Sequence, residues 1–382
     1  MNALLRGFTV AILTVAVSGC SLFSGEEEVG PNPLVEFEAE KEAEVLWSVS
    51  VGDQLGEFYN QFQPAISGDA IFTTDKAGAL HAIDRSNGDQ LWERDLETSM
   101  VGGVGAGYGK LFVTAERGEL IVLDADTGED LWRAVLSSEA VAPAQANSEL
   151  VLVQQIDGKV VAFDLESGAR RWSYTSPVPK LTLRGTGVPI VTQNVTFVSF
   201  SSGKLVALDN ASGDLLWERR ISVPQGRSAL ERMVDADGRM LIKDRTLFAA
   251  SFQGSLIALN PLRAQILWSQ DVSTFHSLSA GYGNIYVSDA ADAVQAFDQR
   301  SSASVWTQAS LGNRSITAPV SIGNAVAVGD SEGYIHFMSQ VDGRFIARVH
   351  TSSDGLRGDL LVKGNQLYAL SNDSRLYAVE LR

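Results

Sequence analysis

Cysteine and histidine are scarce in this sequence, with one cysteine and four histidines in 382 residues. A single cysteine cannot form a disulfide within the chain, so the folded state must be stabilised by packing. The histidines show no HxH or HExxH spacing and have no second cysteine beside them, which argues against a zinc site. They are His81, His276, His336 and His350. The sequence therefore predicts neither an internal disulfide nor a metal centre.

Positive charge and long apolar runs are also limited. The chain has 30 Lys and Arg against 46 Asp and Glu, for a formal net charge of −16, and no basic patch stands out. A chain of this charge is unsuited to binding nucleic acid or an anionic lipid face. The run from Phe8 to Val17 is apolar, but it is too short to span a bilayer.

Catalytic motifs are missing as well. The sequence has no GxSxG or Walker A pattern, and the glycine-rich stretch 103–109 lies between expected strands with no helix after it. The segment beginning at Asp124 resembles the start of an EF-hand loop, but Glu129 and Val135 occupy the positions where that loop needs Gly and Glu. A similar segment at Asp235 fails in the same way. We predict no catalytic residue, no cofactor-binding residue and no metal ligand.

What the sequence does contain is a repeat. The stretch "GELIVLDADTGEDLW" (118–132) returns as "GKVVAFDLESGARRW" (158–172). Further copies start at 78, 203, 254, 292, 333 and 374, and all seven tryptophans fall in the same slot of the repeat. These are Trp47, Trp92, Trp132, Trp172, Trp217, Trp268 and Trp306. A period of about 40 residues is typical of a repeat architecture.

Each repeat has the pattern of four short strands. "KVVAFD" (159–164) alternates outward and apolar residues, and a hairpin signal, Asp157-Gly158, joins it to the preceding apolar run. Asp164 and Gly168 then predict a tight turn into a strand that ends near the tryptophan. A proline recurs in the expected first strand, where an edge strand tolerates it. These prolines are Pro64, Pro143, Pro189 and Pro319.

Four antiparallel strands per repeat predict an all-β fold, the β-propeller. Seven copies contain both halves, whereas the eighth is split between 374–382 and the segment around Trp47. We therefore expect eight four-stranded antiparallel blades, closed by the N-terminal strand completing the last blade. The tryptophans should pack between neighbouring blades. Ala347 occupies their slot in the seventh copy, so that junction should be the least well packed.

The N-terminus differs in kind from the repeats. Arg6 and the apolar run 8–17 are typical of a secretory signal, and small residues lead directly to Cys20 in "VSGC". This ending resembles the bacterial lipobox, which implies a lipoprotein signal peptide over 1–19 and lipidation of Cys20. Ser21 resembles the residue that sorts lipoproteins to the outer membrane. An ordinary cleaved signal with a chance cysteine is the alternative. Residues 20–43 are acidic and predict a flexible tether, and 44–382 form the propeller.

Departures from the repeat are where function is expected. The stretch from the tryptophan to the next repeat is about 10–13 residues in five cases, but it is 17 from Trp172 to Pro189 and 23 from Trp217 to Met240. Trp47 to Pro64 is also 17, but this stretch belongs to the closing blade across the ring. Connectors of adjacent blades emerge on the same face, so these insertions should lie side by side. Apolar residues flanked by charges in long loops predict a protein-binding patch, although ordinary solvated loops are the alternative. The candidate residues are Leu181, Leu183, Arg184, Arg232, Asp235 and Asp237.

Two family resemblances follow from these residues. The repeat resembles the tryptophan-docking repeat of PQQ-dependent quinoprotein dehydrogenases, but the chain lacks the cysteines of their vicinal disulfide, so this resemblance covers the scaffold. From the lipobox to the last repeat, the chain is similar to the BamB family, the propeller lipoproteins of the bacterial outer-membrane β-barrel assembly machinery. The stretches that carry this second resemblance are "LTLRG" (181–185), "ERMVDAD" (231–237) and "GDSEGYIHFMSQVDGRF" (329–345).

The BamB resemblance implies a function. It points to docking on the periplasmic POTRA domains of BamA through Leu181, Leu183, Arg184, Asp235 and Asp237. The expected protein is a scaffold without enzymatic activity or cofactor, held by lipid on Cys20 to the periplasmic face of the outer membrane. It would assist folding and insertion of β-barrel proteins, with unfolded barrel proteins and, indirectly, the other assembly lipoproteins as further partners. The alternatives are a quinoprotein-like dehydrogenase and a periplasmic chaperone that acts alone.

Overall fold

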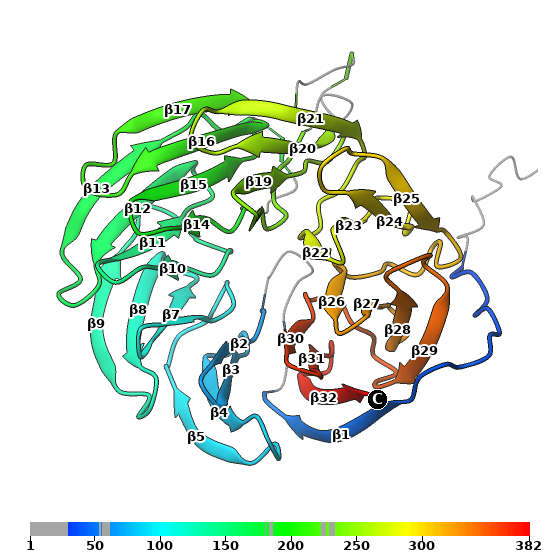
Figure 1. Ribbon diagram of the computed structural model, residues 1–382. Helices are drawn as coiled ribbons and strands as arrows, with labels where there is room; N and C mark the ends of the chain where they lie inside the picture. Colours follow the sequence, from blue (N-terminus) through cyan, green and yellow to red (C-terminus); the bar gives the residue numbers. More distant parts are fainter. Residues whose placement is uncertain are drawn as a thin grey trace, which may run out of the picture. The chain divides into compact units, whose positions relative to one another are not determined.

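The repeated strands pair into eight four-stranded antiparallel sheets, arranged as blades around a ring (Figure 1). The structure is a computed structural model that describes residues 30–52, 55, 62–179, 181–182, 186–222, 227–228 and 234–382. Residues 31–382 form one compact unit, and each sheet lies within it. The eight-bladed, all-β propeller predicted from the repeats is therefore confirmed.

The blades are numbered in chain order, and their strands run from the ring centre outward. Blade one consists of β2 (Ala65–Ser67), β3 (Ala70–Thr74), β4 (Ala79–Asp84) and β5 (Gln90–Asp95), and blade two of β6 (Gly105–Gly107), β7 (Lys110–Ala115), β8 (Glu119–Asp124) and β9 (Asp130–Val135). Blade three consists of β10 (Gln145–Ala146), β11 (Leu150–Gln154), β12 (Lys159–Asp164) and β13 (Arg170–Thr175), and blade four of β14 (Ile190–Val191), β15 (Val195–Phe200), β16 (Lys204–Asp209) and β17 (Leu215–Arg220). Blades five to eight consist of β18 (Leu241–Lys243), β19 (Thr246–Ala249), β20 (Ser255–Asn260), β21 (Gln265–Asp271); β22 (Ser279–Gly281), β23 (Asn284–Ser288), β24 (Val294–Asp298), β25 (Ser304–Gln308); β26 (Val320–Ile322), β27 (Ala325–Gly329), β28 (Tyr334–Ser339), β29 (Phe345–His350); and β30 (Leu361–Lys363), β31 (Gln366–Leu370), β32 (Arg375–Leu381) with β1 (Ala43–Ser50).

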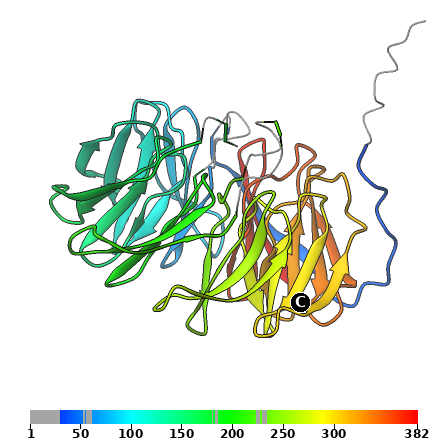
Figure 2. The same ribbon diagram turned by 90° about the horizontal axis from the view of Figure 1, so that it is seen from above.

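The strands run between two faces of the propeller, as the side view shows (Figure 2). The segments that link one blade to the next, together with the turns between second and third strands, form one face, which we call the connector face. The turns between first and second and between third and fourth strands form the other. All connectors between blades therefore lie on the connector face, because each blade has an even number of antiparallel strands.

The four recurring prolines lie just outside the strands in which they were expected. Pro189 and Pro319 directly precede β14 and β26, Pro64 directly precedes β2, and Pro143 lies two residues before β10. Each innermost strand is only two or three residues long in these blades. A proline before the strand costs the sheet no ladder hydrogen bond, which explains this position.

The ring closes through the first and last strands of the chain. Strand β1 pairs antiparallel with β32, from Ala43 opposite Leu381 to Ser50 opposite Arg375. Beyond them, the backbone N–H of Arg382 donates to the carbonyl of Glu42 at 2.9 Å. The N-terminal segment therefore supplies the outer strand of blade eight, which confirms the closure predicted from the split repeat.

Six of the seven tryptophans of the repeat join their own blade to the next one by a hydrogen bond, and Trp47 packs on the Gly88 turn of blade one without such a bond. The indole N–H of Trp132 donates to the carbonyl of Leu165 at 3.0 Å, and that of Trp172 donates to Asn210 at 2.7 Å. The acceptors lie in the turn between third and fourth strands of the following blade. Trp92, Trp217, Trp268 and Trp306 make the same bond to Ala125, Pro261, Gln299 and Gln340. The predicted packing of tryptophans between blades is confirmed, and the apolar clusters likewise span neighbouring blades.

The structure of the turn that accepts this bond explains why aspartate and glycine occur in it. In blade three, the Asp164 carboxylate accepts the backbone N–H of Ser167 at 2.9 Å and the hydroxyl of the same residue at 2.8 Å, and these bonds lower the carboxyl pKa. Gly168 follows with φ of +68°, and a Cβ there would lie 2.7 Å from the Trp132 ring. Glycine is needed because the backbone is left-handed and an indole covers the turn.

Blade seven carries Ala347 where the other complete blades carry tryptophan. The next blade has no turn between its third and fourth strands, because β32 and β1 come from opposite ends of the chain. A tryptophan here would therefore have no turn carbonyl to bind. The sequence suggests a loose junction, but Ala347 is buried with Ile346 against Val379 and Leu381. Aliphatic packing replaces the indole contact.

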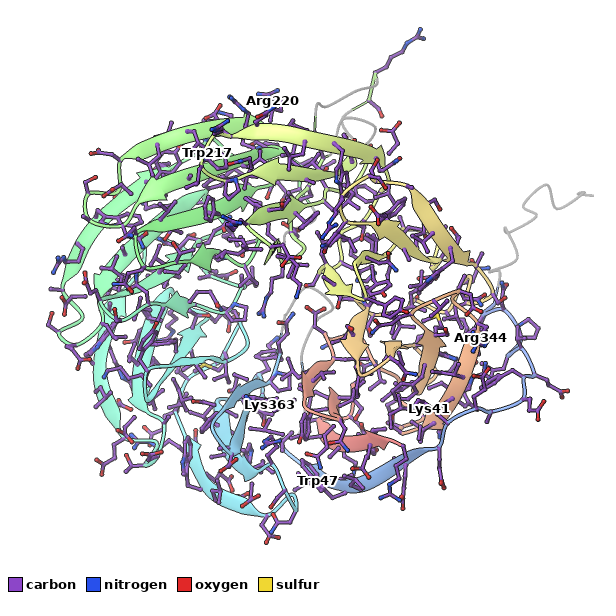
Figure 3. The ribbon with its side chains drawn as sticks, viewed as in Figure 1. Lys41, Trp47, Trp217, Arg220, Arg344 and Lys363 are labelled. Atoms are coloured by element: carbon purple, nitrogen blue, oxygen red, sulfur yellow. The ribbon has the colours of Figure 1, made fainter. Side chains whose placement is uncertain are left out.

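Residues 31–42, the N-terminal strap, lie along the outer side of blade seven (Figure 3). The backbone N–H groups of Glu40 and Lys41 both donate to the carbonyl of Ile346 at 3.0 Å. The Glu40 carboxylate pairs with the Arg344 guanidinium at 2.7 Å. This part of the expected flexible tether is therefore docked, which differs from the expectation. Backbone N–H groups of the strap find an acceptor on β29, and Glu40 finds a cation in the turn before that strand, so these contacts hold the strap in spite of its polar composition.

Beneath the strap lies a buried charge network. The fully buried Arg314 donates to Asp330 at 2.7 Å and to the Asn32 carbonyl of the strap at 2.7 Å. His336 donates from Nε2 to Asp330 at 2.8 Å and accepts from Arg348 at Nδ1. Burial lowers the pKa of His336 against the pull of Asp330. The imidazole is thus neutral near pH 7, and the strap is tied to charges inside the blade.

Candidate functional site

The ends of the second strands hold the connectors in place on the connector face. At this end of β7, the Thr114 hydroxyl donates to the carbonyl of Ala140 in the next connector at 2.6 Å. The Ser199 hydroxyl does the same to Ala236 at 2.8 Å. A short polar side chain at the end of a strand in one blade thus fixes the connector of the following blade. The connectors are therefore held by the propeller at defined points.

Two long connectors of adjacent blades meet at such a point. They are the β13–β14 connector (176–189) and the β17–β18 connector (221–240). The β1–β2 connector (51–64) is as long as the first of them, but it follows the closing blade. A Cβ added to Gly187 in the first would lie 2.9 Å from the Ala236 carbonyl in the second and 2.3 Å from the Ser199 hydroxyl. Only glycine permits this approach. The described ends of the two insertions therefore lie side by side, as predicted.

The first connector presents apolar side chains to solvent. Leu181 is 44% exposed, and Val178 is similarly exposed three residues earlier. Leu183 and Arg184, which the sequence also selects, lie outside the described residues. The described part of this connector therefore fits the expected apolar patch.

The second connector differs from the expectation. Asp235 is fully buried and Asp237 is 8% exposed, whereas both were expected in an exposed loop. The Asp235 backbone pairs with Phe252, whose N–H donates to the Asp235 carbonyl at 2.6 Å, and the carboxylate accepts the N–H of Ala236 at 3.1 Å. Asp235 thus fixes this part of the connector through its backbone and its carboxylate. Arg232, the third residue selected in this connector, lies outside the described residues.

A cavity of about 620 Å³ also opens at the connector face. Val188 and Asp237 line it from the two long connectors, and Phe275 and His276 line it from the β21–β22 connector (272–278). Sequence reasoning did not select the last two residues, because their connector has an ordinary length and carries no motif. Phe275 is nevertheless 44% exposed, which is unusual for a phenylalanine.

The described residues offer little for metal chemistry or membrane crossing. Among them, no three His, Cys, Asp or Glu side chains are grouped so that they could bind a metal ion. No helix in the described part of the chain has the length and apolar character to cross a membrane. Cys20, the expected lipidation site, lies outside the described residues. The arrangement is that of a surface with exposed apolar groups, a cavity and buried structural carboxylates.

Comparisons with known proteins agree with this geometry. The family model described as outer membrane protein assembly factor BamB matches residues 31–100, 76–308 and 294–382. The assembly factor BamB of Pseudomonas aeruginosa is 50% identical over 370 residues, which cover 97% of each chain. The crystal structure of BamB from Moraxella catarrhalis has a TM-score of 0.82 at 27% identity and covers 89% of this chain and 100% of that one.

The quinoprotein scaffold resemblance also appears, at the level of fold alone. The quinohemoprotein alcohol dehydrogenase of Comamonas testosteroni has a TM-score of 0.71 at 14% identity, over 88% of this chain and 76% of that one. The match to the assembly factors extends through almost the whole sequence, and their name describes outer-membrane protein assembly. With its eight closed blades and its 50% identity to such a relative, the chain belongs to the BamB family of outer membrane protein assembly factors.

Proposed function

We propose that this protein is a scaffold lipoprotein without enzymatic activity that binds the periplasmic POTRA domains of BamA through its connector face. It assists the folding and insertion of β-barrel proteins at the outer membrane. The observation that carries this proposal is the meeting of two long connectors of adjacent blades at Gly187 and Ala236, with Leu181 exposed in the first of them. Membership of the assembly-factor family supports a partner in the outer-membrane assembly machinery.

The residues divide into two roles. Leu181, Leu183 and Arg184 belong to the connector with exposed apolar side chains, so they would contact the partner. An apolar anchor with an arginine at its margin is a common centre of binding energy in interfaces. Asp235 and Asp237 are buried and would position the second connector. Substituting them should weaken binding by disturbing the loop.

The membrane attachment is part of the same proposal. Lipid on Cys20 would hold the protein to the inner leaflet of the outer membrane, on the periplasmic side. A diacylglyceryl group with an added acyl chain supplies the two or more hydrocarbon chains that stable anchoring requires.

Binding to purified BamA periplasmic domains, measured by calorimetry, tests the interface. Leu183→Glu combined with Arg184→Ala should weaken binding by roughly thirtyfold or more, because hot-spot losses run at about 2 kcal/mol or more. Leu181→Glu should weaken it in the same direction. The matched control is Leu262→Glu, which changes a leucine that is 88% exposed in a turn of the opposite face. All variants should melt like the wild type.

Other outcomes would assign other functions. Wild-type affinity in the Leu183 and Arg184 variant would place the interface elsewhere. Binding of unfolded barrel proteins without any affinity for BamA would indicate a chaperone that acts alone. A stoichiometric absorbance change with redox activity after addition of PQQ would indicate a quinoprotein enzyme.

A further inference from the structure

The cavity at the connector face is large enough for a ligand. Its volume of about 620 Å³ falls within the range of about 300–1,000 Å³ that is common for small-molecule sites. Its walls include the β21–β22 connector, the β29–β30 connector (351–360) and the β31–β32 turn (371–374). Segments from separate blades thus converge on one space.

The described residues that line the cavity carry more carboxylates than cationic side chains. Asp237, Asp292 and Asp359 line it, against Arg357 as the one lysine or arginine among the described lining residues. One Arg357 guanidinium nitrogen already donates to the Leu55 carbonyl at 3.0 Å. The Ser277 hydroxyl donates to Asp359 at 2.6 Å, which holds that carboxylate in place. The described lining therefore carries excess negative charge.

Hydrogen-bond acceptors are in excess as well. The Asn372 side-chain nitrogen donates to the Asp354 carbonyl at 2.7 Å, which fixes the orientation of the amide. Its oxygen is buried and accepts no hydrogen bond from the described residues. A buried acceptor without a donor costs free energy, so this part of the cavity wall is poorly satisfied in the absence of a ligand.

His276 and Phe275 complete the site. Burial lowers the pKa of the His276 imidazole against the opposing pull of Asp359 and Asp292, so the ring is neutral near pH 7. No ring nitrogen of His276 forms a hydrogen bond with the described residues that surround it, and a neutral imidazole has one nitrogen that accepts. The Phe275 ring lies 4.3 Å from the His276 ring between centroids. The cavity thus has an aromatic wall beside its acceptors.

We propose that this cavity binds the guanidinium group of an arginine side chain presented by a polypeptide segment. A guanidinium is planar, always charged and carries five donors, so it can pair with Asp359 while stacking on the ring of Phe275, two residues before the Ser277 that donates to this carboxylate. The volume exceeds that of one side chain, which leaves room for the flanking residues of the segment. The net charge of −16 would attract such a segment from a distance. This site does not depend on the BamA interface proposed above.

A short peptide tests the proposal without any partner protein. The probe is fluorescein-labelled Ala-Phe-Arg-Ala amide, and the matched peptide carries citrulline, which keeps the shape of arginine without its charge. Fluorescence polarisation with the full-length protein should show binding of the arginine peptide that weakens with salt. The citrulline peptide should bind at least about tenfold more weakly, because it loses the charge-assisted hydrogen bonds.

Variants locate the site. Asp359→Asn, which can still accept the Ser277 hydroxyl, and Phe275→Ala should each weaken binding of the arginine peptide by about tenfold. Asp214→Asn removes an equal charge from an exposed position before β17 and should bind like the wild type. Thermal melts of each variant separate loss of the site from loss of the fold.

Three results would overturn the proposal. Equal binding of the arginine and citrulline peptides would show that charge is not recognised. Unchanged affinity in both cavity variants would place binding elsewhere. Free arginine amide binding as tightly as the peptide would assign the cavity to a small cation and not to a polypeptide segment. None of these results bears on BamA binding, so the two proposals fail separately.

Discussion

The turn glycines that face tryptophan allow a quantitative prediction, and Gly213 is the best placed of them. Its φ is +78°, and an added Cβ would lie 2.7 Å from Cδ2 of Trp172. Carbon atoms prefer about 3.5–4.0 Å, so the ring would have to move by roughly 1 Å. Trp172 is buried in an apolar cluster and bonded to the Asn210 carbonyl at 2.7 Å, which opposes this movement.

Gly213→Ala should therefore lower the free energy of unfolding through two effects. Placing alanine in a left-handed conformation costs about 1–2 kcal/mol. Overpacking against a fixed indole adds about 1–3 kcal/mol. Gly283→Ala is the matched control, because Gly283 has φ of +79° and nothing lies within 4 Å of its added Cβ. The control should show the first loss alone.

Urea unfolding followed by tryptophan fluorescence measures both variants. Gly213→Ala should be the less stable of the two by about 1–3 kcal/mol, which is the overpacking part alone. Adding Trp172→Leu should remove most of that difference, since the double-mutant cycle then lacks the clash. Equal losses at Gly213 and Gly283 would refute the reasoning, because they would show that the indole does not hold the turn.

Three further predictions concern the strap, its charge network and the anchor. The pKa of His336 is lowered in the folded state, so the unfolded chain binds its proton first as the pH falls through about 6.5. The free energy of unfolding should then decrease from pH 7 towards pH 5. Urea titrations of His336→Gln should show a smaller slope of this free energy against pH. An unchanged slope would mean that His336 does not titrate in this range. The lowered pKa of Asp330 adds a loss of the same sign below about pH 4. Phe37→Ala should lower the free energy of unfolding by about 1–2 kcal/mol in the same assay, because this ring packs on blade seven. Val35→Ala, at a more exposed side chain, should leave it nearly unchanged. Equal effects of the two variants would argue against a docked strap. Cys20→Ser should give a folded protein that no longer sediments with membranes, and mass spectrometry of an unmodified mature Cys20 in the wild type would exclude the anchor.

The residues of the repeat could be read from the sequence because they act over short and regular distances. Strand alternation, the Asp164 turn and the positive φ of Gly168 depend on neighbours within a few residues. The tryptophan contact spans blades, but it joins the same two positions of successive repeats, as from Trp92 to Ala125 and from Trp132 to Leu165. A contact repeated around the ring leaves a periodic trace in the sequence, and closure followed from counting the copies.

The candidate site was predictable only in part. Connector length showed where insertions occur, and the even number of strands placed them on one face. The burial of Asp235 was not predictable, because its partner Phe252 belongs to the next blade and follows no repeat. Phe275 and His276 left no signal either, since the cavity that they line exists only where separate connectors converge.

The strap shows most clearly which features the sequence predicts and which only the tertiary structure determines. Its sequence is acidic and contains two prolines, which by composition predicts a flexible tether. The tertiary structure places Glu40 beside Arg344 and the Asn32 carbonyl beside Arg314, across about three hundred residues of chain. Sequence periodicity determined the blades, because each blade repeats one set of contacts. Only the folded ring decided the strap, the cavity and the buried carboxylates, because each depends on a single complementary pairing between distant segments.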